Sequence, residues 1–456
     1  MDLMSFVKGI NSILWGPVMI FLLLGTGILI SYKLRFLQIR KLGFAFKQTF
    51  KDIFKKEDKA DNDGMSSFQA LATAIAAQVG TGNLAGVATA IAAGGPGAVF
   101  WMWISGFFGL GTIFAEAILA QVFKTRINGE VRGGPAYYIR VGLKNKYLAG
   151  FFSIAIILAL GFMGNMVQSN SIGEALSTAF NIPSILTGII VALLAGLIIF
   201  GGMSRIASFT EKIVPVMAII YIVGSLVIVF FNIENLLPAF KMIFYGAFNP
   251  AAATGGIIGV TIKEAIRYGV ARGLFSNEAG MGSTPHAHAV AKVKHPGEQG
   301  LVAMVGVVID TGVVCTLTAL VILTTGAIET GLTGSALTQT AFSNGFGNIG
   351  SMLLAICLFF FAFSTIISWY FFGESNVLYL FGKKGLSIYK LLVLICIIFG
   401  TTMKVDLVWE LADAFNGLMV IPNLIALIGL VSLVVKVTGD YESNFLQNKA
   451  SEYEKR

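Results

Sequence analysis

The residues best suited to chemistry in this 456-residue chain are polar ones that interrupt an apolar, alanine-rich stretch. The stretch runs from Ser66 to Gly94, and its centre reads Gln78-Val79-Gly80-Thr81-Gly82-Asn83. Each glycine costs a helix about 1 kcal/mol relative to alanine, and backbone groups without partners are costly in hydrocarbon. We therefore predict a helix that breaks here and offers free backbone groups to a ligand. The alternative is an unbroken helix whose small residues pack closely against a neighbour.

A second interruption, GLFSNEAGMGSTP, begins at Gly273 and ends at Pro285. Paired interruptions at corresponding positions of two halves are typical of transporter binding sites. The N-terminal end of a half-helix attracts a carboxylate, whereas a C-terminal end presents carbonyls that suit an ammonium group or a hard cation. The two breaks together predict a site for a small zwitterion. The side chains expected to add contacts, rather than merely to pack helices, are Gln78, Thr81, Asn83, Ser276 and Asn277.

The fourth apolar segment carries a further group of amide side chains, Asn165, Gln168 and Asn170. Residues three apart share a helix face, so Asn165 and Gln168 point to the same side. We expect one of the three amides to reach the ligand. The alternative is an interhelical hydrogen bond.

The ninth apolar segment has adjacent hydroxyls at Ser364 and Thr365. Together with carbonyls freed at 76–79, they could form an all-oxygen cage for a monovalent cation. Hydroxyls in spans also bond back to their own helix, which is the alternative. Trp369 and Phe275 could wall a small pocket and exclude larger side chains, or could be ordinary core or lipid-facing aromatics.

Acidic residues inside apolar segments are functional candidates by default. Glu278 lies within the second break, where it could accept N–H groups that the break frees. Glu278 or Asp310 could instead carry a proton. The full set of such acids is Glu116, Glu174, Glu264, Glu278, Asp310, Glu374 and Asp413.

The composition places these residues in a membrane. Hydrophobic residues make up 56% of the chain and charged residues 12%, against roughly 25% charged in a soluble domain. The net charge of +8 resides in loops between apolar segments, so no nucleic-acid partner is expected. An enzyme is not expected either, because no Ser/His/Asp arrangement, HExxH motif, Walker loop or pair of catalytic carboxylates occurs.

The apolar segments predict eleven membrane spans. Basic residues concentrate in the loops after spans one and three, which predicts a multi-pass cell-membrane protein with its N-terminus outside and its C-terminus in the cytoplasm. Ten spans follow the first, and because five is odd, the second group of five enters the membrane with opposite orientation. The spans are 11–31, 68–94, 98–123, 148–178, 184–202, 209–232, 255–282, 299–326, 347–371, 385–402 and 411–436. The expected domains are a first helix with its basic loop (1–65), two five-helix repeats (66–232 and 233–436) and a cytoplasmic tail (437–456).

The segments AAQVGTGNLAG and RGLFSNEAGMGSTPHAHA resemble the alanine/glycine:cation symporter family, and the resemblance extends across spans two to eleven. It implies an all-α membrane protein in which one N-terminal helix precedes a LeuT-type five-plus-five inverted repeat with two broken helices. It also implies symport of alanine or glycine with sodium by alternating access, in a protein that needs no organic cofactor and acts as a monomer.

The same resemblance implies site residues. Sodium would bind the carbonyls of Ala76, Val79 and Phe361 and the hydroxyls of Ser364 and Thr365. Gln78 stands where neurotransmitter-type relatives have a small residue, which argues against a second sodium site at Asn83. The residues implied around the substrate are Gln78, Thr81, Gly82, Asn83, Phe275, Ser276, Asn277, Met281, Thr365 and Trp369.

Two other functions remain compatible with the residues alone. A proton-coupled symporter would use Glu278 or Asp310, and its uptake would follow a pH gradient without sodium. A channel or receptor would show passive flux or none, without accumulation driven by a gradient.

Overall fold

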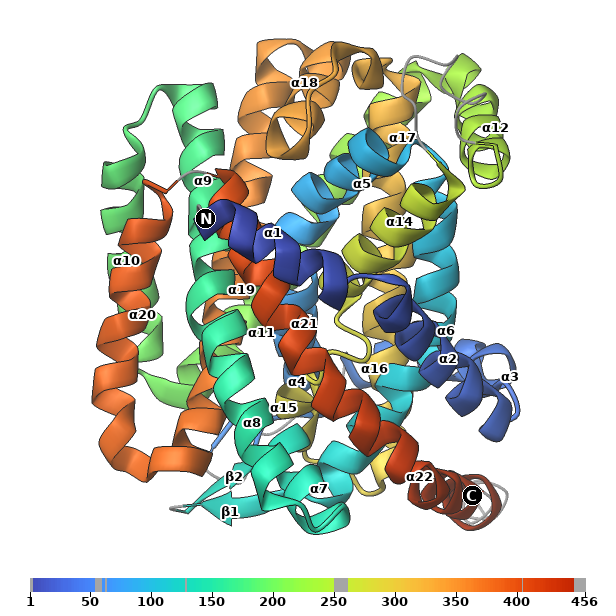
Figure 1. Ribbon diagram of the computed structural model, residues 1–456, viewed down its shortest axis with the longest axis vertical. Coiled ribbons are helices and arrows are strands. Elements are labelled where there is room, and N and C mark those ends of the chain that lie inside the picture. The colour runs from blue at the N-terminus through green and yellow to red at the C-terminus, as the bar shows by residue number, and fades with distance from the viewer. Residues whose placement is uncertain are drawn as a thin grey trace.

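The computed structural model describes residues 3–53, 60–61, 64–127, 129–249, 261–403 and 405–446, which are almost entirely helical (Figure 1). The first half comprises α1 (Leu3–Leu14), α2 (Pro17–Lys33), α3 (Leu37–Ile53), α4 (Ser67–Gln78), η1 (Gly82–Gly86), α5 (Val87–Gly94), α6 (Ala98–Val122), β1 (Thr125–Ile127), β2 (Glu130–Arg132), α7 (Pro135–Gly142), α8 (Lys146–Ile156), η2 (Ile157–Gly164), α9 (Asn165–Phe180), α10 (Ser184–Ile199) and α11 (Gly202–Phe231). The second comprises η3 (Ile233–Asn235), α12 (Leu236–Gly246), α14 (Ile262–Asn277), α15 (Pro285–Ala289), α16 (Pro296–Val307), η4 (Val308–Cys315), α17 (Thr316–Thr324), η5 (Ala327–Thr330), α18 (Gly334–Phe346), α19 (Asn348–Phe381), η6 (Gly382–Gly385), α20 (Leu386–Gly400), α21 (Val405–Gly429), α22 (Val431–Asp440) and η7 (Tyr441–Phe445).

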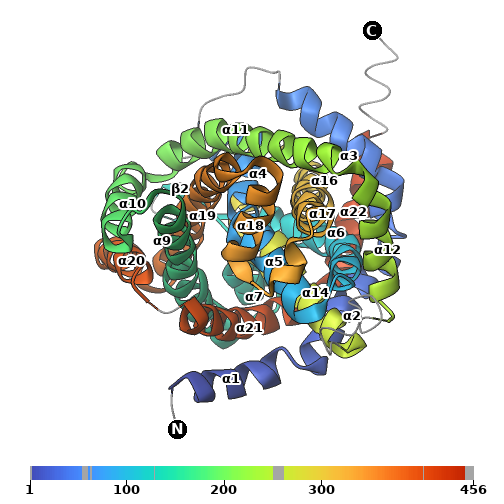
Figure 2. The same ribbon diagram turned by 90° about the horizontal axis from the view of Figure 1, so that it is seen from above.

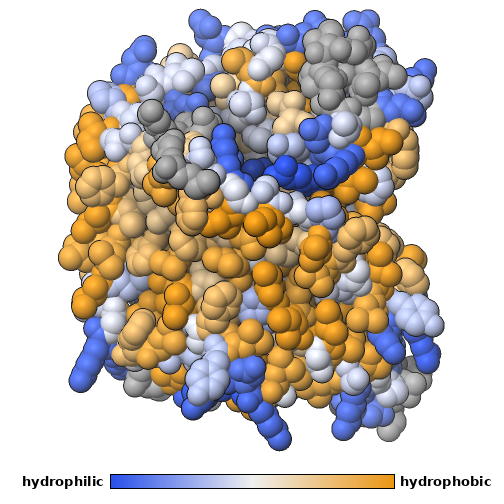
Figure 3. Space-filling view, in the orientation of Figure 1, coloured by the Kyte–Doolittle hydropathy of each residue, from blue (hydrophilic) through white to orange (hydrophobic). Residues whose placement is uncertain are grey.

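The surface has the pattern of a membrane protein. Apolar side chains form a broad band around the middle, and hydrophilic ones gather toward the two ends (Figure 3). Among the described residues, six segments are long and apolar enough to cross a membrane, and counting the bent pairs α1–α2 and α4–α5 as one span each gives eight. Eleven spans remain a prediction, because part of the expected span 255–282 lies outside the described residues. The other six candidate segments are Ala98–Val122, Lys146–Phe180, Gly202–Phe231, Pro296–Thr324, Asn348–Gly400 (which contains α19, η6 and α20) and Leu407–Gly429.

The expected first span, 11–31, is wrong in its bounds, because two helices with a 41° bend occupy this region. Gly16 is extended (ψ −176°), as expected for a residue whose helical conformation is disfavoured by the proline that follows it. Pro17 occupies the first position of α2, where its missing N–H costs nothing. Helix α1 consequently leaves the line of α2 and lies along α21 at the rim of the bundle (Figure 2).

The interrupted segment α4–α5 lies near the middle of the bundle (Figure 2). Helix α4 packs on α11 and α19, α5 packs on α14, and α14 runs along α6. A Cβ on Gly269 of α14 would lie 2.3 Å from the carbonyl oxygen of Ala98, so glycine is what lets α14 and α6 approach backbone to backbone. The two breaks are therefore held inside the protein rather than against lipid.

Several elements between the expected spans were not predicted. Helix α3 lies in the basic loop after α2, and α12 and α18 lie between longer helices. The strands β1 and β2 pair antiparallel, with Thr125 opposite Arg132. These elements are shorter than a membrane span, so a search for long apolar runs does not find them.

Candidate substrate and ion site

The first break lies between α4 and η1, as expected, and its two helical parts meet at 47°. The helix ends because Val79 leaves the helical conformation (φ −84°, ψ 89°). Two side chains then accept hydrogen bonds from the backbone N–H groups that the break frees. Asn83 Oδ1 accepts from Gly80 N at 2.9 Å, and Gln168 Oε1 accepts from Thr81 N at 3.2 Å. The open backbone is thus supported both from within the break and from α9.

The second break follows α14, which ends where Glu278 adopts a left-handed conformation (φ 58°). The backbone N–H groups of Gly280 and Gly282 donate to the two carboxylate oxygens of Glu116, at 3.0 and 2.9 Å. The expectation that Glu278 accepts the freed N–H groups is therefore wrong. The acid that does so lies on α6, far away in the sequence, and Asn423 of α21 donates to it as well, at 2.6 Å.

Sequence reasoning gave Glu116 no particular role. Its carboxylate is fully buried, and its hydrogen bonds with Gly280, Gly282 and Asn423 satisfy it. The available signal was an acid in the middle of the apolar run GTIFAEAILAQ, which by itself marks a functional or structural site. Glu116 and Asn423 together anchor the loop after α14 to α6 and α21.

The structure brings the two breaks against each other. Gln78 Nε2, at the end of α4, donates to the backbone carbonyl of Asn277 at 2.8 Å. A Cβ on Gly82 would lie 3.1 Å from Ser276 Cα, so only glycine allows this closeness without displacement. The two interruptions therefore meet at one place inside the protein, and a zwitterion site between them stays a prediction.

Asp310 lies in the π-helical turn η4, beside both breaks, and is fully buried. Its Oδ1 accepts from Asn83 Nδ2 at 2.5 Å and from Ser276 Oγ at 2.8 Å. Its Oδ2 accepts from Thr311 Oγ1 at 2.7 Å. Asn83 and Ser276 were predicted as substrate contacts, and here they connect both breaks to one carboxylate.

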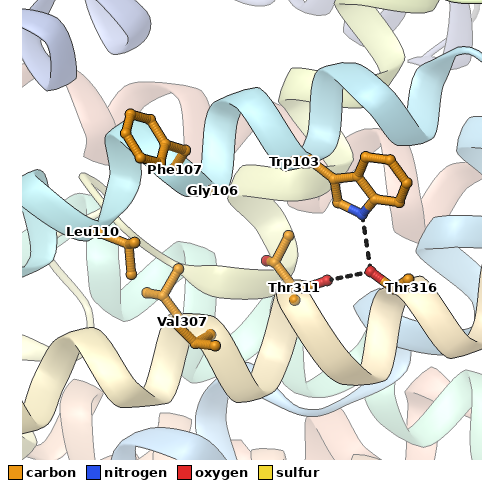
Figure 4. A pocket seen from close by; sticks show the side chains of 9 residues that line it. Trp103, Gly106, Phe107, Leu110, Val307, Thr311 and Thr316 are labelled. Atoms are coloured by element: carbon orange, nitrogen blue, oxygen red, sulfur yellow. Dashed lines mark hydrogen bonds between the residues drawn. The ribbon is translucent and has the colours of Figure 1, made fainter. Parts of the chain in front are cut away.

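An apolar groove of about 390 Å³ lies between α6 and the α16–η4 segment (Figure 4). Trp103 Nε1 donates to Thr316 Oγ1 at 2.9 Å along its wall, and Thr311 lines it too. No charged side chain lines this groove, so it lacks the chemistry to hold a zwitterion. The candidate site is the region between the breaks instead.

Glu278 is bonded to side chains rather than to backbone. Trp369 Nε1 donates to its Oε1 at 2.5 Å and Ser283 Oγ donates to its Oε2 at 2.6 Å. The rings of Trp369 and Phe275 meet edge to face with centroids 5.9 Å apart. Met281 is buried, and its N–H donates to the Glu278 carbonyl at 3.1 Å. The two aromatic rings expected to wall a pocket are thus in contact at the second break.

The expected sodium ligands also lie close together. Thr365 Oγ1 donates to the Ala76 carbonyl at 2.8 Å and to the Phe361 carbonyl at 3.0 Å. Ser364 Oγ donates to the same Phe361 carbonyl at 2.9 Å. This is a cluster of neutral oxygens next to Val79, where α4 ends, and such a donor set suits a hard monovalent cation.

The three amides of the fourth apolar segment have different partners. Gln168 reaches the first break through Thr81. Asn165 Nδ2 donates to Gly161 O of the preceding turn at 3.0 Å. Asn170 Nδ2 donates to Gly400 O at 2.8 Å, at the end of α20, so the structure does not bring Asn170 to the breaks.

A buried ion pair joins α14 to α21. Arg272 donates to the two oxygens of Asp413 at 2.9 and 2.7 Å, and its guanidinium lies 5.1 Å from the Trp409 ring centroid. Trp409 in turn contacts Phe275, with centroids 5.1 Å apart. Sequence reasoning noted Asp413 only as one acid among seven. The signal for the pair was Arg272, an arginine within an interrupted apolar segment.

The sequence profile of the Sodium:alanine symporter family matches residues 1–455. The Methanococcus maripaludis protein named "Sodium/alanine symporter AgcS" is 44% identical over 96% of this chain and 97% of its own length. The Bacillus subtilis protein named "Probable sodium/glutamine symporter GlnT" is 42% identical over 96% of this chain and 91% of its own. The crystal structure of an Eremococcus coleocola manganese transporter shares the fold, with a TM-score of 0.52 at 17% identity over 79% of this chain and 76% of that one.

Proposed function

Because the chain belongs to the sodium:alanine symporter family and is therefore a cation-coupled amino-acid symporter, we propose that its coupling ion is sodium and its substrate alanine or glycine. The observation that carries the proposal is the meeting of two broken helices, joined by the Gln78–Asn277 hydrogen bond. Backbone held open in this way supplies polar groups inside a membrane protein without a lipid-exposed polar surface.

The substrate would lie between the breaks. Its carboxylate would face the N-terminal end of η1, where Thr81 and Gly82 begin the helix, because such an end favours negative charge. Its ammonium group would face the C-terminal end of α14 near Asn277. The Thr81 hydroxyl is buried without a partner among the described residues, which supports a ligand at this position.

Sodium would bind beside this site, at the carbonyls of Ala76, Val79 and Phe361 and the hydroxyls of Ser364 and Thr365. Binding there joins the end of α4 to α19, so the ion would organise the first break before the amino acid binds. Opening one side of the site and then the other would complete transport by alternating access.

We further propose the topology that the sequence predicts. One helix would precede two inverted five-helix halves, 66–232 and 233–436, each containing one break. The N-terminus would lie outside and the tail after 436 in the cytoplasm, as the basic loops favour. The transporter would function as a monomer.

The experiment that tests this function is uptake of labelled alanine into proteoliposomes, with an inward sodium gradient compared with potassium at matched pH. We expect accumulation only with sodium, and at least a roughly tenfold loss in Ser364→Ala/Thr365→Ala, equivalent to about 1.4 kcal/mol of lost ion affinity. Thr89→Ala is the control, because among the described residues that hydroxyl donates to Ala85 O, one turn earlier in η1, and not to another helix. It should leave uptake unchanged.

The second candidate is proton coupling, favoured by the burial of Glu278 and Asp310 beside the breaks. It predicts accumulation that follows an imposed pH gradient, needs no sodium and is lost in Asp310→Asn or Glu278→Gln. Passive flux under either gradient would support a channel instead.

The size of the substrate provides a separate prediction. Trp369→Ala should let glutamine compete with labelled alanine far better than in the wild type, by roughly 10–200-fold, the range typical of pocket-size discrimination. Trp369→Phe is the control, since it keeps an aromatic ring against Phe275 while it removes the hydrogen bond to Glu278 and only part of the indole volume. Unchanged competition in a Trp369→Ala protein that still transports alanine would exclude Trp369 from the substrate pocket.

A further inference from the structure

Asn416 on α21 is buried, with 1% of its surface exposed, and neither atom of its side-chain amide has a hydrogen-bond partner among the described residues. Buried side-chain polar atoms are usually paired, so a fully unpaired amide calls for an explanation. Several other buried amides near the breaks, such as Gln78 and Asn165, lack a partner at one atom only. Asn416 lacks a hydrogen-bond partner at both Oδ1 and Nδ2.

The neighbours of Asn416 on α21 show which way its face points. At 3.6 residues per turn, Trp409, Asp413, Asn416 and Asn423 fall within one narrow stripe of the helix. Trp409 contacts Phe275, and Asp413 pairs with Arg272.

The other end of this stripe also meets the second interrupted segment. Asn423 Nδ2 donates to the carbonyl of Gly280 at 2.9 Å. Asn416 lies seven residues, roughly 10 Å along the axis, from both Trp409 and Asn423. Its side chain therefore faces the stretch between Phe275 and Gly280, which is the C-terminal end of α14 and the second break.

Two other buried polar atoms without partners among the described residues belong to residues beside Trp369 and Gly164, which contact each other. Ser368, next to Trp369, has an unpaired buried hydroxyl, and Asn165 has an unpaired buried Oδ1. Asn165 follows η2, and α21 packs directly on η2. Asn416, Ser368 and Asn165 lie on α21, α19 and α9, and α9 packs on both of the other helices. A ligand that contacts these helices can satisfy such atoms.

We propose that Asn416 binds the amino-acid substrate directly, through the α-ammonium and α-carboxylate groups rather than the side chain. An amide has one acceptor atom and one donor atom, which match the two charged groups of a zwitterion. Its Oδ1 accepts from the ammonium group and its Nδ2 donates to the carboxylate. This assignment rests on the proposed function and adds α21 to the helices that form the substrate site.

The test compares wild type with Asn416→Ala in two measurements: KM for labelled alanine and glycine in proteoliposomes, and Tm of the purified protein with and without each amino acid. We expect KM to rise at least tenfold for both amino acids and by the same factor, because the contacted groups are common to both. The Tm without substrate should be unchanged or higher, since the replaced amide has no partner to lose. Ile425→Ala, on an exposed part of the same helix, is the control and should change neither quantity.

An unchanged KM in a folded Asn416→Ala protein overturns the proposal. A fall of several degrees in the substrate-free Tm also overturns it, because Asn416 would then be a structural residue. A KM effect confined to alanine overturns it too, because the amide would then contact the side chain of the substrate. Failure of the proposed function looks different, because wild type itself would then show neither uptake nor a Tm increase with alanine or glycine. In that case a rise in the substrate-free Tm of Asn416→Ala still supports a ligand-binding role for Asn416, because it shows that the buried amide is unpaired when no ligand is bound.

Discussion

Asp413→Ala is expected to destabilise the protein by about 3–5 kcal/mol, because removal of one partner leaves the other charge buried and unpaired. The Arg272 and Asp413 side chains are only 11% and 17% exposed, and their contact is bidentate. Removing both partners in Arg272→Ala/Asp413→Ala should cost less than Asp413→Ala alone, since no isolated charge remains. Thermal unfolding of the purified protein measures both variants.

A more exposed ion pair provides the matched control for Arg272 and Asp413. Arg40 and Glu442 also form an ion pair, at 3.1 Å, but their side chains are 41% and 29% exposed. Glu442→Ala should therefore cost at most about 1 kcal/mol. A similar loss in Glu442→Ala and Asp413→Ala would show that burial of the Arg272–Asp413 pair is not what makes it strong.

The position of the pair gives it a functional consequence. It connects α14 to α21 next to Phe275 and Trp409, at the start of the second break. Arg272→Lys keeps the charge but loses the planar fork that holds both carboxylate oxygens. We expect this variant to fold and to take up labelled alanine more slowly in proteoliposomes, because the end of α14 at the proposed substrate site would be held to α21 less rigidly.

Gly80→Ala is expected to reduce sodium-dependent alanine uptake about 100-fold or more and to cost about 1–3 kcal/mol of stability through overpacking. A Cβ at this position would lie 2.4 Å from Thr365 Oγ1 and 3.2 Å from Gln168 Oε1. Thr365 cannot move away freely, because its hydroxyl donates to the carbonyls of both Ala76 and Phe361. The new methyl group would therefore disturb the proposed ion site directly.

Gly86→Ala is the matched control in the same broken segment. Its Cβ would meet nothing closer than the Thr81 carbonyl oxygen, at 3.9 Å, so uptake and stability should both be retained. Combining Gly80→Ala with Thr365→Ala separates two effects. Stability should recover in part because the 2.4 Å contact with Thr365 Oγ1 is removed, while sodium dependence should stay lost because the hydroxyl is gone. Recovery of sodium-dependent uptake in the double variant would contradict a role for Thr365 in binding the ion.

Much of this architecture could be read from local sequence. Long apolar runs identify membrane helices, because no other backbone arrangement of such residues satisfies its hydrogen bonds in lipid. The breaks could be located for the same reason, since Gly80, Gly82 and Gly280 weaken a helix wherever they occur. The bend at Gly16 and Pro17 was equally local, and it was missed only because the apolar run continues through it.

Local sequence did not show which residues form hydrogen bonds with each other across helices. Gln168 meets the first break whereas Asn165 and Asn170 bond elsewhere, although all three lie within two turns of one helix. The choice depends on the rotation of α9 about its axis, which follows the π-helical η2, where the usual 3.6-residue period is interrupted.

Hydropathy and the backbone preferences of single residues were thus enough to predict a helical membrane transporter, the positions of its two breaks and the residue types that surround them. The tertiary structure was needed to show that Glu116 rather than Glu278 accepts the N–H groups of the second break and that Arg272 pairs with Asp413. It was also needed to show that the buried Asn416 amide has no partner among the described residues. Each of these contacts joins helices that are distant in the chain. Such contacts depend on how whole helices pack, and no local pattern of residues specifies that packing.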